Sequence, residues 1–345
     1  ASRARLTDPI DAKVGEDIIR AVAGIKTDFA AEGAKLATRQ SSQTVLERLM
    51  PVVPGLIGGS ADLTGSVGTL TKQHGIVKPD DFAGNYIHYG VREHAMGASM
   101  NGLALHGGIV PYAGTFLVFS DYCRPSIRLS ALMEQRVVYV MTHDSIGLGE
   151  DGPTHQPVEQ LAALRAMPQL HVMRPADSVE CAECWELALL SKDRPTIMTL
   201  TRQGLPLLRT TPTDDNLSAK GAYVLIEPEG GRDVTVLATG SEVSLAVNAA
   251  KMLEEQGIKA AVVSMPCWEL FEAQDEGYQA AVLGTTPRVG VEAAVGFGWD
   301  KWLGETGKFI GMRGFGASAP AQELYKHFEI TPEAVVAAAR DLISN

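Results

Sequence analysis

Short apolar segments alternate with segments of helical periodicity along most of the chain, and this alternation restricts the possible folds more than any other feature. Apolar residues recur at helical spacing over 11–36 and again over 41–50. Beyond Pro54, short apolar runs bounded by glycine predict strands at 56–57, 86–89, 109–113, 137–141, 171–173 and 196–200. Helices are expected between them at 92–105, 116–134, 158–167 and 178–190. This alternation is typical of an α/β fold with a doubly wound parallel sheet.

The alternation stops once and then starts again. Residues 204–219 contain two prolines, several threonines and aspartates and no periodicity, which is the composition of an interdomain linker. A second unit follows, with strands expected at 234–238, 260–264 and 288–292, a helix at 241–256, and helices from Ala321 and Pro332. We therefore expect two doubly wound α/β domains, over 1–205 and 221–345, joined by a linker over 206–220.

Charge and cysteine content exclude several classes of protein. Thirty basic against 41 acidic residues give a formal charge of -11, which argues against nucleic acid or an anionic membrane as the main partner. No apolar run approaches the roughly 20 residues that a membrane-spanning helix needs. Four cysteines without a charged-then-apolar leader indicate a reducing compartment, and the expected location is cytoplasmic.

Two short motifs are weak signals of chemistry. The string G-x-G-x-x-G at 147–152 follows an expected strand, as in a dinucleotide site. Glu150 and Asp151 would bring two negative charges toward a pyrophosphate, so we reject that interpretation. Cys181 and Cys184 form a single C-x-x-C without a second pair, and their spacing on one helical face favours packing over redox or zinc chemistry.

The segment from His143 to Pro157 combines two histidines, three acids and several glycines after an expected buried strand. Such residues are ordinary turn formers, and a solvated surface loop is the structural alternative. Long irregular loops inside compact domains are usually functional, however, and ligands of open α/β sheets bind beyond the carboxyl ends of the strands. A metal site with His143, Asp151 and His155 is a further alternative, but hydroxyl and phosphate recognition fits the pattern better.

Two other features are open to both a structural and a functional interpretation. Phe116, Phe119 and Tyr122 recur at i, i+3 and i+6, which would place them on one helical face, either as core or as stacking partners for a flat ring. Glu93 lies between an expected strand and a helix rich in Ala, Gly and Met. A carboxylate there either pairs with Arg92 or has a raised pKa and a functional role.

Taken together and in this order, these motifs resemble the transketolase family. The R-E-H element and the 142–157 loop are the most specific part of the resemblance, which runs from about residue 10 to the end of the chain. The matching strings are LATR at 36–39, IGGSADL at 57–63, YGVREH at 89–94, GTFLVF at 114–119, residues 142–157, RPAD at 174–177, TRQ at 201–203 and ATGSEV at 238–243.

The resemblance implies a thiamine-diphosphate pyrimidine-binding domain followed by a smaller transketolase C-terminal-type domain, which would move a two-carbon ketol unit between sugar phosphates. Glu93 matches the acid that hydrogen-bonds the aminopyrimidine ring, and burial against apolar walls suits an acid that shares its proton. His155 matches a residue that contacts hydroxyls near the reacting carbon and can exchange protons there, and His143 would lie near the acceptor carbonyl, so both are expected to be catalytic. The other matched positions are Asp62, Phe116, Phe119 and Tyr122 for the coenzyme and Arg39, Ser66, His143, Asp151, His155 and Arg202 for the sugar phosphate.

One matched position departs from the family pattern. The family usually continues D-L-x-P-S-N, whereas this chain has Gly65 and Val67 in place of the Pro and the Asn. A glycine loosens that turn and weakens the assignment of Ser66.

The resemblance also implies a part that has no match in this sequence. In the family, an N-terminal domain binds the diphosphate and a magnesium or calcium ion through a G-D-G motif, and it faces the pyrimidine domain of the other subunit in a homodimer. Because the chain starts at Ala1 and has no such motif, we expect a fragment or one subunit of a split enzyme. The alternatives are an inactive dimerisation fragment, or another thiamine-diphosphate enzyme such as a deoxyxylulose-phosphate synthase or a 2-oxo-acid dehydrogenase β-subunit.

Overall fold

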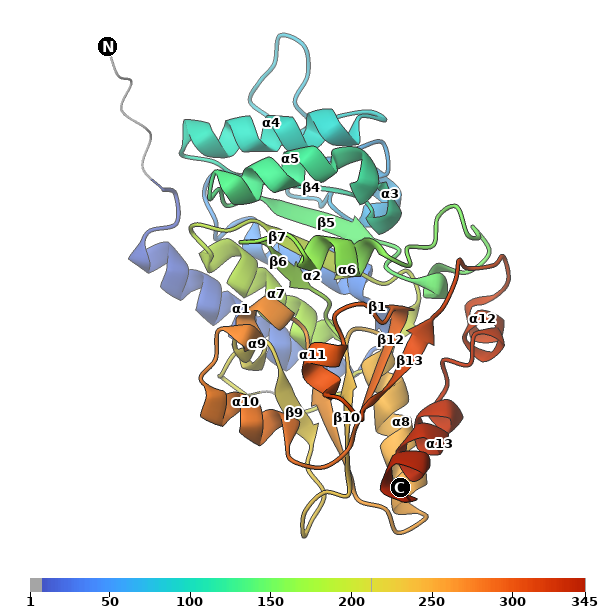
Figure 1. Ribbon diagram of the computed structural model, residues 1–345. Helices are drawn as coiled ribbons and strands as arrows, with labels where there is room; N and C mark the ends of the chain where they lie inside the picture. Colours follow the sequence, from blue (N-terminus) through green and yellow to red (C-terminus); the bar gives the residue numbers. More distant parts are fainter. Residues whose placement is uncertain (1–7, 212, 345) are drawn as a thin grey trace.

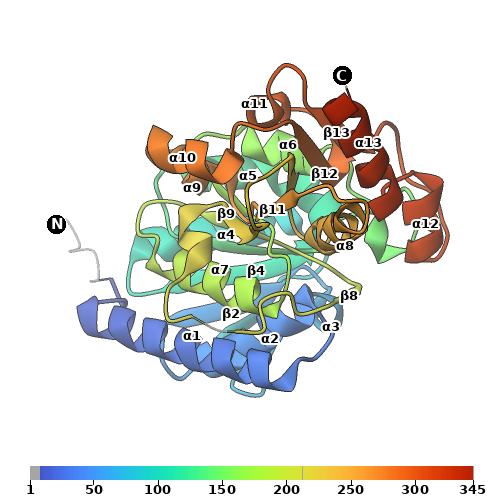
Figure 2. The same ribbon diagram turned by 90° about the horizontal axis from the view of Figure 1, so that it is seen from below.

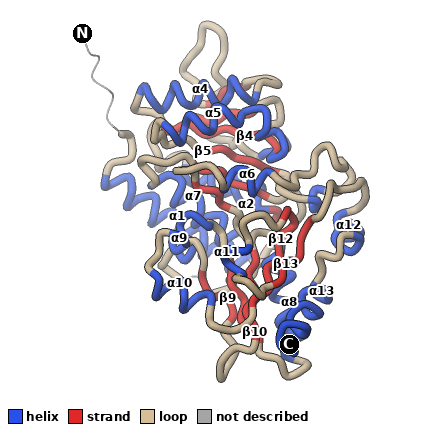
Figure 3. Tube along the Cα trace, viewed as in Figure 1, coloured by secondary structure: helices blue, strands red, loops and turns tan. Residues whose placement is uncertain are grey.

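The computed structural model describes residues 8–211 and 213–344, which form two α/β units, each built on one sheet (Figure 1 and Figure 3). The first sheet has six strands in the order β3-β2-β4-β5-β7-β6, and all its neighbouring pairs are parallel. This confirms the predicted doubly wound sheet. The strands are β2 (Leu56–Ser60), β3 (Tyr86–His88), β4 (Val110–Phe116), β5 (Val138–Thr142), β6 (His171–Met173) and β7 (Thr196–Leu200).

Helices cover both faces of the first sheet because its strands are apolar on both sides. In β5, Val138 and Val140 pack in the core shared with α1, α2 and α7, whereas Tyr139 and Met141 pack in the core shared with α4, α5 and α6. Figure 2 shows α1 and α2 alongside α7. The helices are α1 (Ala12–Glu32), α2 (Thr38–Leu49), α3 (Thr64–Val67), α4 (Glu93–His106), α5 (Ser120–Leu132), α6 (Gln160–Arg165) and α7 (Ser178–Leu190).

The two cysteines of the C-x-x-C motif are packing residues of α7. Cys181 and Cys184 are completely buried and contribute, with Trp185, to the core beneath the first sheet. Burial also raises the pKa of both thiols, which keeps them protonated and unreactive.

The second sheet has the order β13-β12-β10-β11-β9, and only β9 runs antiparallel to its neighbour. One face is covered by α8 and α13, and the other packs against α9, α10 and α11. The strands are β9 (Tyr223–Ile226), β10 (Val234–Ala238), β11 (Ala260–Ser264), β12 (Arg288–Val295) and β13 (Lys308–Met312). The helices are α8 (Glu242–Glu254), α9 (Trp268–Glu272), α10 (Glu276–Leu283), α11 (Asp300–Leu303), α12 (Ala321–His327) and α13 (Pro332–Ser344).

Several short elements were not predicted from the sequence. The strands β9 and β13 are mostly half-buried, so neither has the continuous apolar run that marks β10 and β11. The segment 204–219 without periodicity is partly structured, because β8 (Gly204–Leu205), just before the expected linker, pairs antiparallel with β1 (Leu36–Ala37). Within the linker expected over 206–220, η3 (Leu217–Lys220) forms a 3₁₀ turn. The proposed domain boundaries remain a prediction. Residues 1–7 of the expected first domain, Pro212 of the linker and Asn345 of the second domain lie outside the described part of the chain. No helix among the described residues is long and apolar enough to cross a bilayer.

Candidate active site

The predicted site residues leave the carboxyl ends of neighbouring parallel strands. Asp62 follows β2, Phe116 ends β4, His143 follows β5 and Arg202 follows β7. Because β2, β4, β5 and β7 are consecutive in the parallel sheet, these residues lie side by side at the carboxyl ends of the strands, which we call the carboxyl edge of the sheet. Glu93 joins them from the first turn of α4, after β3.

Five aromatic rings form a continuous group at this edge. The ring centroids of Phe116 and Phe119 lie 5.6 Å apart with the rings 7° from parallel, and Tyr122 follows at 5.9 Å from Phe119. His143 stacks on Phe116 at 3.7 Å, and His155 contacts Phe119 edge-on at 5.6 Å. Tyr122 is 66% exposed, so the outer end of the row could receive another flat ring.

The single helical face expected for these aromatic residues was wrong. Phe116 is the last residue of β4, and a 3₁₀ turn, η1 (Leu117–Phe119), separates it from α5. A 3₁₀ helix repeats every three residues, so the i, i+3 spacing still brings Phe119 beside Phe116.

Arg39, Arg202 and His143 form a locally basic group in an acidic protein. Arg39 Nη1 donates to the carbonyl of Ser66 at 2.5 Å, and its Nε atom is buried without a hydrogen-bond partner among the described residues. Burial and the neighbouring charge of Arg202 lower the pKa of Arg39. Two guanidinium groups that repel each other, one with an unpartnered donor, form a site that an anion would satisfy.

Reciprocal hydrogen bonds between two threonines hold these arginines beside each other. The Thr38 N–H donates to Thr201 Oγ1 at 3.0 Å, and the Thr201 N–H donates to Thr38 Oγ1 at 2.7 Å. Arg39 and Arg202 are the next residues in the chain, so this buried pair fixes the start of α2 against the end of β7.

His143 is held neutral and in an unusual backbone conformation. Its side chain is 3% exposed, its Nδ1 atom lies 2.8 Å from Thr142 Oγ1, and its φ is +60°. Burial, followed by the charges of Arg39, Arg202 and His155, lowers its pKa to about 3. A positive φ at a residue other than glycine is costly and persists only where the surrounding structure imposes it.

Glu93 does not form the salt bridge that was one of its two sequence-based interpretations. Arg92 Nη1 donates instead to the Tyr89 carbonyl at 3.1 Å, and no ion pair between Arg92 and Glu93 occurs in the described part of the chain. Glu93 is half-buried and lies near α5, where burial and then the Glu93 charge raise the pKa of Cys123 to about 12. A half-buried carboxylate without a cation remains available to a ligand.

The side chains of three predicted residues at this edge form no hydrogen bond or ion pair with the other predicted site residues among those that the structure describes. Asp62, at φ +62°, and Asp151 are both exposed, and Ser66 offers its carbonyl rather than its hydroxyl to Arg39. The alternative metal site is not formed, because no three His, Cys, Asp or Glu side chains gather suitably among the described residues. The roles of Asp62, Asp151 and Ser66 therefore remain predictions.

A buried ion cluster behind the site was missed in the sequence. Arg174 is completely buried, and its Nε atom donates to Asp144 Oδ2 at 2.9 Å, directly after His143. Its Nη1 atom donates to the Thr239 carbonyl at 3.1 Å and to the Glu242 carboxylate, both in the second unit. Arg174 belongs to one of the family-like strings, but nothing in the sequence indicated that it would be buried among acids.

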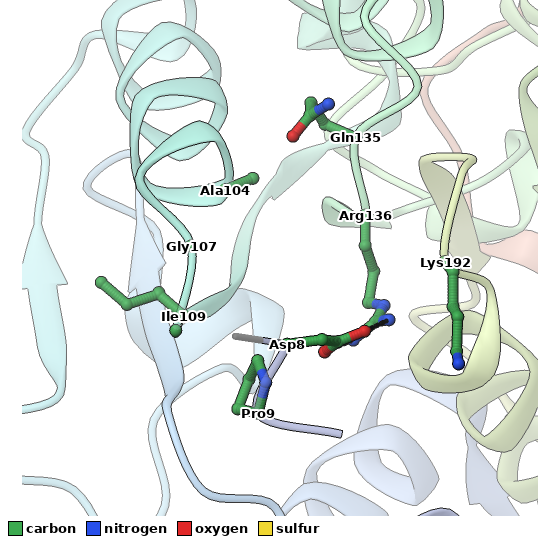
Figure 4. Close-up of a pocket in the computed structure, with 9 residues that line it drawn as sticks. Asp8, Pro9, Ala104, Gly107, Ile109, Gln135, Arg136 and Lys192 are labelled. Atoms are coloured by element: carbon green, nitrogen blue, oxygen red, sulfur yellow. Dashed lines mark hydrogen bonds and ion pairs between the residues drawn. The ribbon is translucent and has the colours of Figure 1, made fainter. Parts of the chain in front are cut away.

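A separate hollow lies at the opposite edge of the first sheet, before the amino ends of β4 and β5 (Figure 4). Arg136 reaches into it and forms two hydrogen bonds with the Asp8 carboxylate, at 2.9 and 2.7 Å. The Arg136 guanidinium is already paired and none of the predicted site residues lines this hollow, so we do not assign the functional site to it.

A parallel six-stranded sheet with aromatic and basic groups at the carboxyl ends of its strands, followed by a mixed five-stranded sheet, defines a two-unit α/β protein. Residues 34–206 match the family described as "Transketolase, pyrimidine binding domain", and residues 221–331 match "Transketolase-like TK C-terminal domain". The chain therefore belongs to the transketolase family.

Individual relatives agree with this assignment. A transketolase of Sinorhizobium medicae is 59% identical over 323 residues, which cover 93% of this chain and 46% of that protein. A crystal structure of the Pichia stipitis transketolase in complex with sedoheptulose-7-phosphate is 44% identical with a TM-score of 0.86, and the match covers 93% of this chain and 50% of that one. The chain spans about half the length of the curated relatives that it matches.

One solved structure has a similar length to the matched region. A chain described as "Split gene transketolase, inactive beta4 tetramer" is 25% identical with a TM-score of 0.74, and the match covers 90% of this chain and 99% of that one. This chain therefore matches about half of longer transketolases and nearly all of one split-gene chain.

Proposed function

We propose that this chain supplies the pyrimidine and substrate side of a transketolase-type active site, which transfers a two-carbon ketol unit between sugar phosphates. The observation that carries the proposal is the basic group of Arg39, Arg202 and His143 placed directly against the aromatic row. A phosphate site beside a ring-stacking site suits an enzyme that holds a sugar phosphate against a flat coenzyme.

Arg39 and Arg202 bind the substrate phosphate in this proposal. Their charges oppose each other in the free protein, and a dianion between them would remove that repulsion and satisfy the buried Nε atom of Arg39. The matched position of Ser66 would add a hydroxyl group.

His155 and His143 act on the sugar hydroxyl and carbonyl groups. His143 is neutral because of its burial, so one ring nitrogen can donate and the other can accept a hydrogen bond. His155 is half-buried at the rim, where it could take up or return a proton as charge develops on a substrate oxygen. Asp151, exposed on the same loop, would orient a hydroxyl group.

The aromatic row and Glu93 would hold the pyrimidine ring of thiamine diphosphate. Tyr122 and Phe119 offer ring faces at the outer end of the row, and the half-buried Glu93 carboxylate has no cation partner among the described residues. Glu93 would bind a protonated ring nitrogen, and Asp62 would lie near the coenzyme. When bound, the coenzyme supplies the carbon nucleophile that the side chains themselves lack.

A diphosphate-binding domain from the same or another chain would complete the site and hold the magnesium or calcium ion. The outer face of α4 and α5 supports such a partner, because it exposes Leu105, Leu129 and Leu132 together with Tyr122 of the aromatic row. The family homodimer would place two such sites across one interface. The cytoplasmic location expected from the sequence remains part of this proposal.

The proposal is tested by mixing this chain with the N-terminal half of a transketolase relative, thiamine diphosphate and magnesium. We expect transfer from a ketose phosphate to an aldose phosphate, measured by separation of the sugar phosphates, and no transfer by either half alone. A stable complex of the two halves that binds coenzyme but shows no transfer would contradict the proposal.

A second candidate function is an assembly module without catalysis of its own. The similar split-gene chain, which is described as an inactive tetramer, favours this candidate. It predicts that the chain alone forms a defined oligomer in light scattering and that adding the missing half changes the assembly without producing ketol transfer.

A further inference from the structure

The side chain of Gln156, near the end of the 143–157 loop, links the turn at Gly149 to the second unit. It is 2% exposed, and its Nε2 atom donates to the carbonyl of Gly149 at 2.9 Å and to the carbonyl of Ala317 at 2.9 Å. The first acceptor belongs to the loop itself, and the second to the segment that joins β13 to α12. Its Oε1 atom is buried without a partner among the described residues, so the two Nε2 bonds set the orientation of the side chain.

The segment after β13 closes around the loop at further points. Ser318 Oγ donates to the carbonyl of Glu150 at 2.5 Å. At the end of the loop, the Val295 N–H of β12 donates to the Val158 carbonyl at 3.0 Å. Gly316 has no room for a side chain, because a Cβ atom there would lie 1.7 Å from Gln156 Oε1 and 2.8 Å from its Cδ atom.

The backbone of the loop is folded into short turns. Its N–H groups donate from Leu148 to Ser145, from Gly149 to Ile146, from Gly152 to Gly149, and from His155 and Gln156 back to Gly152. Gly149 and Gly152 both have positive φ angles, which an unrestrained glycine adopts and leaves easily. Contacts from the second unit therefore act together with the Phe116 and Phe119 rings as long-range restraints on the residues around His155.

We propose that the C-terminal domain positions the substrate loop, with Gln156 as a positioning residue that keeps the neighbouring His155 ring against Phe116 and Phe119. Gln156 acts by tying the turn at Gly149 to the backbone of Ala317, and Gly316 is small so that this link can form. The inference rests on the proposed function only for the role of His155; the anchoring itself belongs to this chain alone.

Hydrogen–deuterium exchange of the full chain tests the anchoring directly. In Gly316→Ala the new methyl group displaces the Gln156 carboxamide, so the amides of residues 149–156 should exchange at least about tenfold faster, while those of β5 and α7 stay unchanged. Gly314→Ala is the matched control, because a Cβ atom there meets nothing within 4 Å. Equal loop exchange in the two variants would overturn the proposal.

A second pair of variants tests Gln156 itself. Gln156→Glu removes both donated bonds, whereas Gln279→Glu removes three Nε2 bonds to backbone carbonyls that lie wholly inside the second unit. We expect faster loop exchange only in the first. If Gln156→Glu and Gln279→Glu exchange alike in the loop, Gln156 has no positioning role.

The assembled enzyme provides a kinetic measurement, the KM for a ketose phosphate, that a change in a merely structural residue would not alter by itself. With the diphosphate-binding half present, Gln156→Glu should raise the KM for a ketose phosphate about tenfold, while the thiamine diphosphate concentration for half-maximal activity stays constant. An unchanged KM would count against the proposal. An inactive wild-type assembly would contradict the proposed function instead, and the exchange experiment on the chain alone would still decide the anchoring.

Discussion

At the scale of single residues, the site depends on how the protein controls charge. Among the described residues Glu93 has no cation partner, two arginines are held close together despite their repulsion, and His143 is kept neutral beside them. Each of these arrangements is costly in the free protein and becomes favourable when a ligand of the right charge arrives. The following three predictions concern these groups.

Replacing Glu93 with Ala should nearly abolish ketol transfer in the complete assembly. A positioned acid that binds a coenzyme nitrogen contributes about 10²–10⁴-fold to the rate, so we expect a loss of that order in kcat. Circular dichroism should show an intact fold, because Glu93 is only half-buried at a helix start. The control is Glu323→Ala on the exposed face of α12, which should keep full activity. Full activity in Glu93→Ala would sink the assigned role.

Replacing Arg202 with Ala should weaken phosphorylated substrates more than unphosphorylated ones. A charge-assisted hydrogen bond is worth about 1.5–3 kcal/mol, which corresponds to roughly 10- to 100-fold in KM for a ketose phosphate. An unphosphorylated ketose should be affected only slightly. Arg20→Ala on the exposed surface of α1 provides the control. Equal losses for both kinds of substrate would argue against a phosphate site.

His143 should not titrate near neutral pH. Its folded pKa of about 3 lies below the ordinary histidine value of about 6.5, because burial and three neighbouring groups disfavour the charged ring. The unfolded chain therefore binds more protons between these values, and the stability that the neutral ring contributes is lost as the pH falls from about 6.5 toward 3. In an NMR titration the His143 ring signals should stay constant from pH 8 to pH 5. A midpoint above pH 5 would contradict the buried environment.

At the scale of elements, the local sequence pattern predicted the strands that are buried on both faces and missed those that are half-buried. Continuous apolar runs such as β5 and β10 were identified, because strands buried on both faces have no polar side to disguise them. The half-buried β9 and β13 were missed for the opposite reason. The start of α5 was misplaced, since a 3₁₀ turn and an α-helix share the i, i+3 spacing and differ only in backbone geometry.

The buried α7 gives a prediction at this scale. Because Cys181 and Cys184 lie in the core and burial raises the pKa of their thiols, a thiol reagent should modify them only after unfolding. A double Cys181→Ala and Cys184→Ala variant should bind coenzyme and substrate normally and lose about 1–3 kcal/mol of unfolding free energy through the small cavities. Mass spectrometry locates the modified cysteines. Rapid modification of Cys181 or Cys184 in the native protein would contradict the packing role.

At the scale of the whole molecule, long-range contacts decided what the sequence could not foresee. The motif strings follow strands whose carboxyl ends any parallel sheet aligns, so the residues that they name lie at the same end of the strands, and their roles remain predictions. They did not show that Arg174 would join Asp144 of one unit to Glu242 of the other. Such a cluster brings together residues 30 to 68 positions apart, and no local pattern encodes that geometry.

Removing Arg174 should therefore destabilise the protein strongly. Arg174→Met leaves the buried carboxylates of Asp144 and Glu242 without their cation, and breaking a buried ion pair on one side costs about 3–5 kcal/mol. Lys326→Met breaks an exposed pair with Glu323 and should cost at most about 1 kcal/mol. Urea unfolding followed by tryptophan fluorescence measures both. Similar small losses in the two variants would show that the cluster is not what joins the units.

The reciprocal bonds between Thr38 and Thr201 have a consequence for how the protein behaves before any substrate arrives. They fix two like charges beside each other by backbone geometry, so Arg39 and Arg202 cannot relieve their repulsion by moving apart at their Cα atoms. We therefore expect small multivalent anions such as sulfate or inorganic phosphate to act as counterions for this pair, both competing with a phosphorylated substrate and stabilising the fold. The choice of buffer is thus part of the chemistry of this protein.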